Sequence, residues 1–406
     1  MKFGLNQTDI EQRLDMDKLR RERLQKAERA LRESDADALL LFDVNNIRYV
    51  TSTWLGEWAR DKLMRYAILI PGSQPYLFDF GSAVAHKKMM CPWIADTVYP
   101  SSSTMRGTIP EETGLEKEII DFLVETLKSK GLKKCKIGID MAEIPIVNGL
   151  QAHGFTLVNG QRIMLEARRV KTDEEITLLE YAAATVDAAY SEVVRNLRAG
   201  IRENELVAIV NDVCYRLGCD QVEAVNCISG PRCSPHPHNF ADRLLRPGEF
   251  VYMDVITAFL GYRTCYYRTF HIGKANQAAH DAYKQTYDWL YASIDKVRPG
   301  TDTAEICKVW PKAQEFGYQD EAHAFALQFG HGIGLSVWEF PVISRRVSLD
   351  TPMPIEKNMT FALETFCPTN DGTNGAARLE EMCVVIENGC RVITKYPIEE
   401  LICVDP

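Results

Sequence analysis

The first half of the chain alternates helix-like and strand-like patterns. Residues 17–34 place Leu19, Leu24, Ala27 and Leu31 on one face and charged side chains on the other, which predicts an amphipathic helix. A short, wholly apolar run follows, as in a buried strand. This run covers residues 38–42. The alternation continues with strands at 66–71 and 97–99, a helix at 116–128, and segments 136–140 and 149–153. This alternation predicts an α/β unit, which we place at residues 1–165.

The second half begins with helices and continues with long strands. Thr172 followed three residues later by Glu175 has the form of a capping box, so a long helix is expected from there to about residue 196. The other expected helices are 203–217, 275–295 and 302–316, and the expected strands are 249–256, 259–272, 359–364, 378–386 and 390–393. Helices in front of antiparallel strands predict an α+β domain at 166–406.

Composition and charge narrow the class of protein. The 406 residues are 46% hydrophobic and 25% charged, as in an ordinary soluble globular protein. We expect no membrane-spanning segment and no secretory leader. The twelve cysteines are scattered without a C-x-x-C pair. We therefore expect a cytoplasmic protein with reduced thiols. The net charge of −9 gives no general attraction for nucleic acid.

Acidic residues and one histidine follow apolar runs in the second half. Asp254 and Glu364 are expected at the ends of buried strands, Glu380 at the start of another, and His331 in a glycine-rich turn that leaves its ring accessible. An ionised carboxylate in such a place is unfavourable unless it is paired or binds a metal. Each one alone is more simply a salt-bridged acid, but the four together indicate a metal or proton-transfer site.

The order of these residues resembles that of the pita-bread superfamily of prolidase, creatinase and methionine aminopeptidase, over nearly the whole chain. The matching segments are 46–51 (NIRYVT, leading into a strand of the N-terminal domain), 170–176 (VKTDEEI), Ser229 to Asp254 with His236, Asp242 and Arg243, 261–270 (GYRTCYYRTF), 330–335 (GHGIGL), Glu364 and Glu380. The resemblance implies a pita-bread C-terminal domain with a creatinase/prolidase-type N-terminal domain.

The resemblance also implies a metal site that is altered here. Family peptidases hold two metals on two Asp, one His and two Glu; Asp254, His331, Glu364 and Glu380 match, but Cys265 stands at the second aspartate. A soft thiolate does not reproduce a bridging carboxylate. We therefore expect at most one divalent metal (Zn, Fe or Mn), and a metal-free site in which Cys265 only fills space remains an alternative.

Other expected site residues also follow from the resemblance. His236 or His238 would transfer a proton, since imidazole titrates near neutral pH. Trp338 stands where the peptidases have a further histidine, and it offers a flat wall or a face for a cation. Tyr262, in the second-ligand segment, is a further substrate-binding candidate. Relatives are dimers with shared active sites, so we expect a homodimer whose partner loop supplies substrate-binding groups; these are Trp54, Trp58, Arg60 and Arg65.

These residues predict a hydrolase of a C–N bond in a small, carboxylate-bearing molecule, in the creatinase and Xaa-Pro dipeptidase lineage and not a general peptidase. Glu364 and Glu380 would hold the water or the metal, and His331 would orient them. Tyr267 stands where creatinase has a guanidinium-binding glutamate, so creatine itself is not expected. Two alternatives remain: a metal-dependent lyase of the dimethylsulfoniopropionate type, and a binding protein without catalytic activity.

Overall fold

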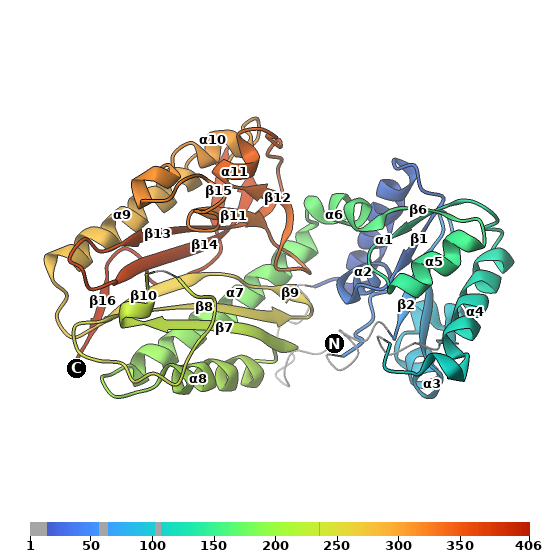
Figure 1. The fold of residues 1–406 in the computed structure, drawn as a ribbon, viewed down its shortest axis with the longest axis horizontal. Helices are drawn as coiled ribbons and strands as arrows, with labels where there is room; N and C mark the ends of the chain where they lie inside the picture. Colours follow the sequence, from blue (N-terminus) through green and yellow to red (C-terminus); the bar gives the residue numbers. More distant parts are fainter. Residues whose placement is uncertain (1–13, 57–63, 102–106, 235) are drawn as a thin grey trace. The chain divides into compact units, whose positions relative to one another are not determined.

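A computed structural model describes residues 14–56, 64–101, 107–234 and 236–406 of the chain (Figure 1). The chain divides into two compact units, Met1–Arg168 and Arg169–Pro406; the boundary expected from the sequence was residue 165. No helix in the described ranges is long and apolar enough to span a bilayer.

A six-stranded mixed sheet forms the centre of the N-terminal unit, in the order β4-β3-β2-β1-β5-β6. Its strands are β1 (Ala38–Leu41), β2 (Tyr66–Leu69), β3 (Tyr76–Phe80), β4 (Val98–Ser101), β5 (Lys136–Ile139) and β6 (Thr156–Asn159). Its helices are α1 (Met16–Arg32), α2 (Val44–Thr51), α3 (Gly81–Met90), α4 (Leu115–Ser129), α5 (Ile144–Ala152) and α6 (Gly160–Arg169). Buried Leu40, Ile68 and Phe78 of the sheet share one core with Leu123 and Leu127 of α4, so the predicted α/β alternation is confirmed in this unit.

Residues 46–51 form a helix instead of leading directly into a strand. The Asp43 carboxylate accepts hydrogen bonds from the backbone N–H groups of Asn45 at 2.9 Å and Asn46 at 3.0 Å, which caps α2. Asn46 in turn donates from its side chain to Asp140 at 2.9 Å. These polar contacts start a helix in a segment whose apolar residues alone do not distinguish helix from strand.

Two sheets face each other in the C-terminal unit. One has the order β16-β10-β8-β7 with β9 paired to β8, and the other has the order β12-β11-β13-β14-β15. The strands are β7 (Gln221–Ser229), β8 (Phe250–Phe259), β9 (Tyr262–Arg263), β10 (Tyr267–Ile272), β11 (Phe329–Gly332), β12 (Glu339–Ile343), β13 (Thr360–Pro368), β14 (Ala376–Ile386), β15 (Gly389–Val392) and β16 (Ile402–Val404). Thr269 of β10 and Arg378 of β14 join the sheets, because the Thr269 hydroxyl donates to the Arg378 carbonyl and accepts from its N–H at 2.9 Å.

Helices cover both sheets of this unit on the outside (Figure 1). They are α7 (Asp173–Asn196), α8 (Glu203–Arg216), α9 (Gln277–Ile294), α10 (Thr303–Cys307) and α11 (Arg345–Ser348). The long α7 and α8 pack on β8 and β7, whereas α9 packs on β13 and β14. The capping box of Thr172 and Glu175 at the start of α7 is confirmed.

Two predicted elements of the C-terminal unit have different bounds in the structure. The helix expected at 302–316 ends at Cys307, because Pro311 cannot donate a backbone hydrogen bond and disfavours a helical residue before it. The strand expected at 259–272 is broken: Leu260 and Gly261 both have positive φ, 46° and 90°, and form the turn between β8 and β9. Cys265 therefore lies between β9 and β10 rather than inside a regular strand.

Candidate active site

Strand pairing in the second sheet brings three candidate ligands to one face. The β13–β14 register places Glu364 opposite Glu380. The β11–β13 register places His331 opposite Ala362, two residues along β13 from Glu364. Because side chains alternate between the two faces of a sheet, His331, Glu364 and Glu380 share a face. All three are buried.

The surroundings of these residues differ from the sequence prediction in two ways. Asp254 and Glu364 lie inside β8 and β13 rather than at strand ends, since both strands continue for several buried residues. The His331 ring is only 1% exposed and belongs to strand β11, so the accessible glycine turn expected there was wrong. A Cβ at Gly332 would lie 2.2 Å from the Phe340 carbonyl oxygen, so this glycine permits close strand packing.

The facing sheet contributes Asp254 and the neighbouring Cys265. Asp254 of β8 lies opposite Asn226 of β7 and Tyr267 of β10. Its Oδ2 accepts a hydrogen bond from Asn226 Nδ2 at 3.1 Å and lies 3.9 Å from the Cys265 sulfur. Cys265 also lies 3.8 Å from Glu380 Oε2, across the gap between the sheets. The thiol therefore connects the two carboxylates.

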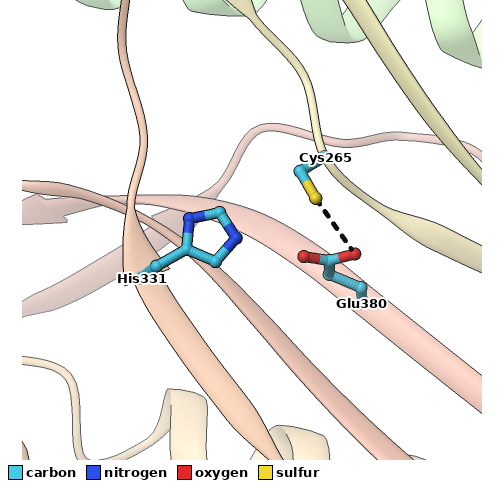
Figure 2. Close-up of side chains that lie close together, drawn as sticks. All are labelled: Cys265, His331 and Glu380. Carbon is cyan, nitrogen blue, oxygen red and sulfur yellow. Dashed lines mark hydrogen bonds between the residues drawn. The ribbon is translucent and has the colours of Figure 1, made fainter. Parts of the chain in front are cut away.

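Cys265, His331 and Glu380 form a compact group of potential ligands (Figure 2). One ligand atom from each lies within 4.8 Å of the other two, and all three side chains are buried. The His331 ring and the Glu380 carboxylate point toward each other, and the Cys265 sulfur points at the same carboxylate from the segment between β9 and β10 (Figure 2). Histidine, thiolate and carboxylate together are a donor set that suits zinc or iron.

Two buried oxygens support the fit of a cation to this group. Asp254 Oδ1 and Glu380 Oε1 have no hydrogen-bond partner within the described part of the chain. A buried carboxylate oxygen without a donor is unfavourable, and a bound metal removes that penalty. The residues present therefore fit one divalent metal on Cys265, His331 and Glu380, with Asp254 beside it.

Burial shifts the proton equilibria of these groups. It raises the pKa of Asp254 to about 7, with a further contribution from the Glu364 charge. Burial also raises the pKa of Glu380 well above its usual range and raises the pKa of the Cys265 thiol. Burial lowers the pKa of His331 to about 4, so this ring is neutral and able to bind a metal. A cation between these groups would favour the ionised carboxylates and thiolate instead.

Glu364 is paired differently from the other candidates. Its Oε2 accepts hydrogen bonds from Arg378 Nη2 at 2.6 Å and Nε at 3.1 Å. Arg378 is fully buried, its guanidinium lies 4.9 Å from the Tyr267 ring centre, and a further bond from Nη2 reaches the Ala326 carbonyl at 2.8 Å. The arginine thus neutralises one of the three buried carboxylates.

The two candidate histidines have different environments. His236 Nδ1 lies 2.6 Å from the Tyr252 hydroxyl, and its Nε2 lies 3.3 Å from the Tyr267 hydroxyl. Burial, followed by the Arg378 and His238 charges, lowers the pKa of His236 well below its usual range. His238 is exposed, with its ring centre 4.1 Å from that of His236. His236 is therefore the histidine that the polar network holds.

Trp338 lies between β11 and β12, with its ring next to that of His331. Its indole is 55% exposed, and its ring centre lies 5.8 Å from His331 and 5.2 Å from Phe329. Phe325 continues the row, 5.2 Å from Phe329. These side chains form an aromatic wall next to His331.

Family comparisons agree with this architecture. Residues 177–387 match metallopeptidase family M24, and residues 23–170 match the creatinase/prolidase N-terminal domain. The chain belongs to the M24 metallopeptidase family. Its C-terminal unit has the pita-bread fold, so the predicted superfamily and the α+β fold class are confirmed.

Several relatives of this M24 protein have curated names. It is 26% identical over 243 residues to an Xaa-Pro dipeptidase from Pyrococcus furiosus. The aligned region covers 59% of this chain and 67% of the dipeptidase. It is 23% identical over 382 residues to the dimethylsulfoniopropionate lyase DddP from Roseobacter denitrificans. The aligned region covers 89% of this chain and 82% of the lyase. The uncharacterized peptidase YqhT from Bacillus subtilis is 28% identical over 70% of this chain and 79% of its own length.

Solved structures share the fold at low sequence identity. A prolidase from Thermococcus sibiricus superposes with a TM-score of 0.77 at 19% identity, over 96% of this chain and all of that one (100%). An Xaa-Pro dipeptidase from Bacillus anthracis gives a TM-score of 0.75 at 20% identity, over 95% of this chain and 99% of the dipeptidase.

Of the remaining substrate-binding candidates, Tyr262 belongs to the C-terminal unit, whereas Trp54 and Arg65 belong to the N-terminal unit. The Tyr262 hydroxyl donates to Glu175 at 3.0 Å, next to the cap of α7. Trp54 is 43% exposed, and Arg65 donates to buried Asp79 and, at 2.8 Å, to the Leu55 carbonyl. Trp58 and Arg60 lie outside the described residues. A dimer with shared active sites stays a prediction.

Three further residues at the site were not singled out from the sequence. Arg378 lies two residues before Glu380 on β14, so strand alternation alone could have placed it on the same face. Asn226 belongs to β7, a strand that the sequence pattern did not reveal. Tyr252 precedes Asp254 by two residues on β8 and contacts His236.

Proposed function

We propose that this M24 enzyme is a hydrolase of a C–N bond in a small, carboxylate-bearing molecule, and that it works with one divalent metal rather than two. The observation that carries the proposal is the group formed by Cys265, His331 and Glu380. A thiol in place of a bridging carboxylate suits a single metal better than a pair.

The charges around this group support one cation. Asp254, Glu364 and Glu380 carry three negative charges when ionised, and Arg378 carries one positive charge; all four are buried. The sum is −2 while the Cys265 thiol keeps its proton and −3 once it is a thiolate, so one divalent ion would offset most of it, and the oxygens without partners on Asp254 and Glu380 are available to it. A divalent metal here would polarise the group under attack and activate water.

The chain's own residues would supply proton transfer and a binding wall. His236, neutral at pH 7, would accept a proton from the attacking water at Nε2 and return it to the leaving nitrogen as the new C–O bond forms and the C–N bond breaks. The exposed face of Trp338 would pack against an apolar or cationic part of the substrate. We do not propose a general peptidase, because Cys265 stands where the family peptidases have their second metal-binding aspartate.

Elemental analysis combined with a substrate panel tests this proposal. The purified protein should hold about one equivalent of zinc, iron or manganese, and it should hydrolyse one of a panel of N-acyl amino acids, creatine analogues and Xaa-Pro dipeptides. Glu380→Gln should lose both the metal and the activity. Two tightly held equivalents after dialysis, or a metal-loaded enzyme that hydrolyses no C–N substrate of the panel, would contradict it.

A lyase is the second candidate, because the similarity to DddP extends over 89% of this chain and 82% of that enzyme. In this alternative His236 would remove a proton next to a carboxylate instead of activating water. Incubation with dimethylsulfoniopropionate distinguishes the two: release of dimethyl sulfide without hydrolysis of any C–N substrate would favour the lyase.

A further inference from the structure

The hydroxyl of Tyr252 forms two short polar contacts that determine where hydrogens lie. It is 2.9 Å from the backbone carbonyl oxygen of Cys233 and 2.6 Å from Nδ1 of His236. A carbonyl oxygen only accepts hydrogen bonds, whereas a phenol has a single proton to donate. The proton must therefore lie on the Cys233 side, or the oxygen–oxygen contact at 2.9 Å would have no hydrogen between its atoms.

The proton position on Tyr252 fixes the proton position on His236. Since the Tyr252 proton points to Cys233, the short contact to Nδ1 needs a hydrogen from the imidazole. The ring is neutral because burial lowers its pKa, so it carries one N–H, and that N–H is at Nδ1. Nε2 then has a lone pair, which accepts a hydrogen bond from the Tyr267 hydroxyl at 3.3 Å.

We infer that Tyr252 is a positioning residue, which holds His236 as the Nδ1–H tautomer and leaves Nε2 as the proton-accepting atom. This inference rests on the proposed function for its catalytic meaning, since His236 is the proton carrier there. The tautomer itself follows from the contacts of the hydroxyl. Tyr252 is fully buried on β8, so its ring cannot turn away to solvent.

The position of Tyr252 connects the histidine to the rest of the site. Tyr267, beyond Nε2, accepts a hydrogen bond from Asn226 at 3.4 Å, and Asn226 donates to Asp254 at 3.1 Å. The lone pair of Nε2 is thus on the side of the ring that leads to the carboxylates. A ring with the other tautomer would present an N–H there and could not accept a proton from water.

Nitrogen NMR of the full-length protein labelled with [15N]histidine tests the inference directly. Comparison with His236→Gln identifies the His236 signals. The wild type should show a protonated Nδ1 and an unprotonated Nε2, Tyr252→Phe should shift the ring toward the Nε2–H form, and Tyr267→Phe should keep the Nδ1–H form. An Nε2–H signature in the wild type overturns the inference, and this measurement does not depend on the folding of any variant. So does an unchanged tautomer in Tyr252→Phe.

Activity measurements separate this inference from the proposed function. On the substrate of the panel that the wild type hydrolyses, Tyr252→Phe should lower kcat about 10- to 100-fold with little change in KM, the usual effect of losing a group that orients a histidine. If Tyr252→Phe lowered kcat by this amount but left the His236 tautomer unchanged, the role of Tyr252 as a positioning residue would be contradicted. If the wild type hydrolyses nothing, the proposed function fails, whereas the tautomer measurement still decides the role of Tyr252.

Discussion

The stability of the metal-free protein should fall with rising pH because of Asp254, and Asp254→Asn should remove that part of the loss. The folded protein keeps the Asp254 proton up to about pH 7, since burial and the Glu364 charge raise its pKa from 3.8. The unfolded chain loses that proton near pH 3.8. Between these values the folded state binds more protons, so the free energy of unfolding decreases as the pH rises.

The size of the effect follows from the shift. Each pKa unit corresponds to 1.36 kcal/mol, so a rise from 3.8 to about 7 amounts to about 4 kcal/mol when Asp254 is fully ionised. About 3 kcal/mol of this falls between pH 5 and pH 8. The asparagine is nearly isosteric, it has no charge to desolvate, and its side-chain oxygen can still accept the hydrogen bond from Asn226.

Chemical denaturation of the metal-stripped protein at pH 5 and pH 8 measures the effect on the C-terminal unit. The wild type should lose about 3 kcal/mol more than Asp254→Asn over this range. Asp350→Asn, an exposed substitution in the same unit, is the matched control and should follow the wild type. One equivalent of zinc added at pH 8 should restore stability to the wild type, because a cation favours the ionised carboxylate. Equal pH dependence in the wild type and Asp254→Asn would refute the reasoning.

Four other substitutions test separate parts of the site. Cys265→Ser should lower the metal content measured after dialysis, and unchanged content would show that the thiol only fills space. His236→Ala should lower turnover at least ~100-fold, whereas His238→Ala should stay near the wild type; the reverse result would assign the proton transfer to His238. Glu203 accepts hydrogen bonds from the backbone at both ends of the loop that carries these histidines, Ser229 at 2.9 Å and Ala241 at 2.7 Å. Glu203→Gln should cost about 1–3 kcal/mol in thermal or chemical unfolding, and an unchanged midpoint would exclude this role.

Local sequence patterns predicted much of the fold correctly. The capping box of Thr172 and Glu175 and the amphipathic pattern of residues 17–34 are properties of neighbouring residues, and both gave the helices found in the structure. The prediction was wrong where an interaction beyond the apolar pattern decided the outcome. Asp43 starts a helix at a segment expected to lead into a strand, and Pro311 limits the helix expected at 302–316.

The candidate site divides in the same way. The order of Asp254, His331, Glu364 and Glu380 along the chain indicated a metal site, since residue types and their spacing are visible in the sequence. The same comparison showed that Cys265 replaces the second aspartate of the family peptidases. Which of them meet depends on strand register and on the packing of two sheets, which place Cys265 3.8 Å from Glu380.

The sequence by itself determined the residue types of this site, because acids, a histidine and a thiol keep their chemistry wherever they lie. Only the tertiary structure decided their states. Burial between the sheets raises the pKa of Asp254, Arg378 neutralises Glu364, and the Tyr252 hydroxyl contacts the ring of His236. These effects depend on distances between segments far apart in the chain, and loss of solvent strengthens each of them.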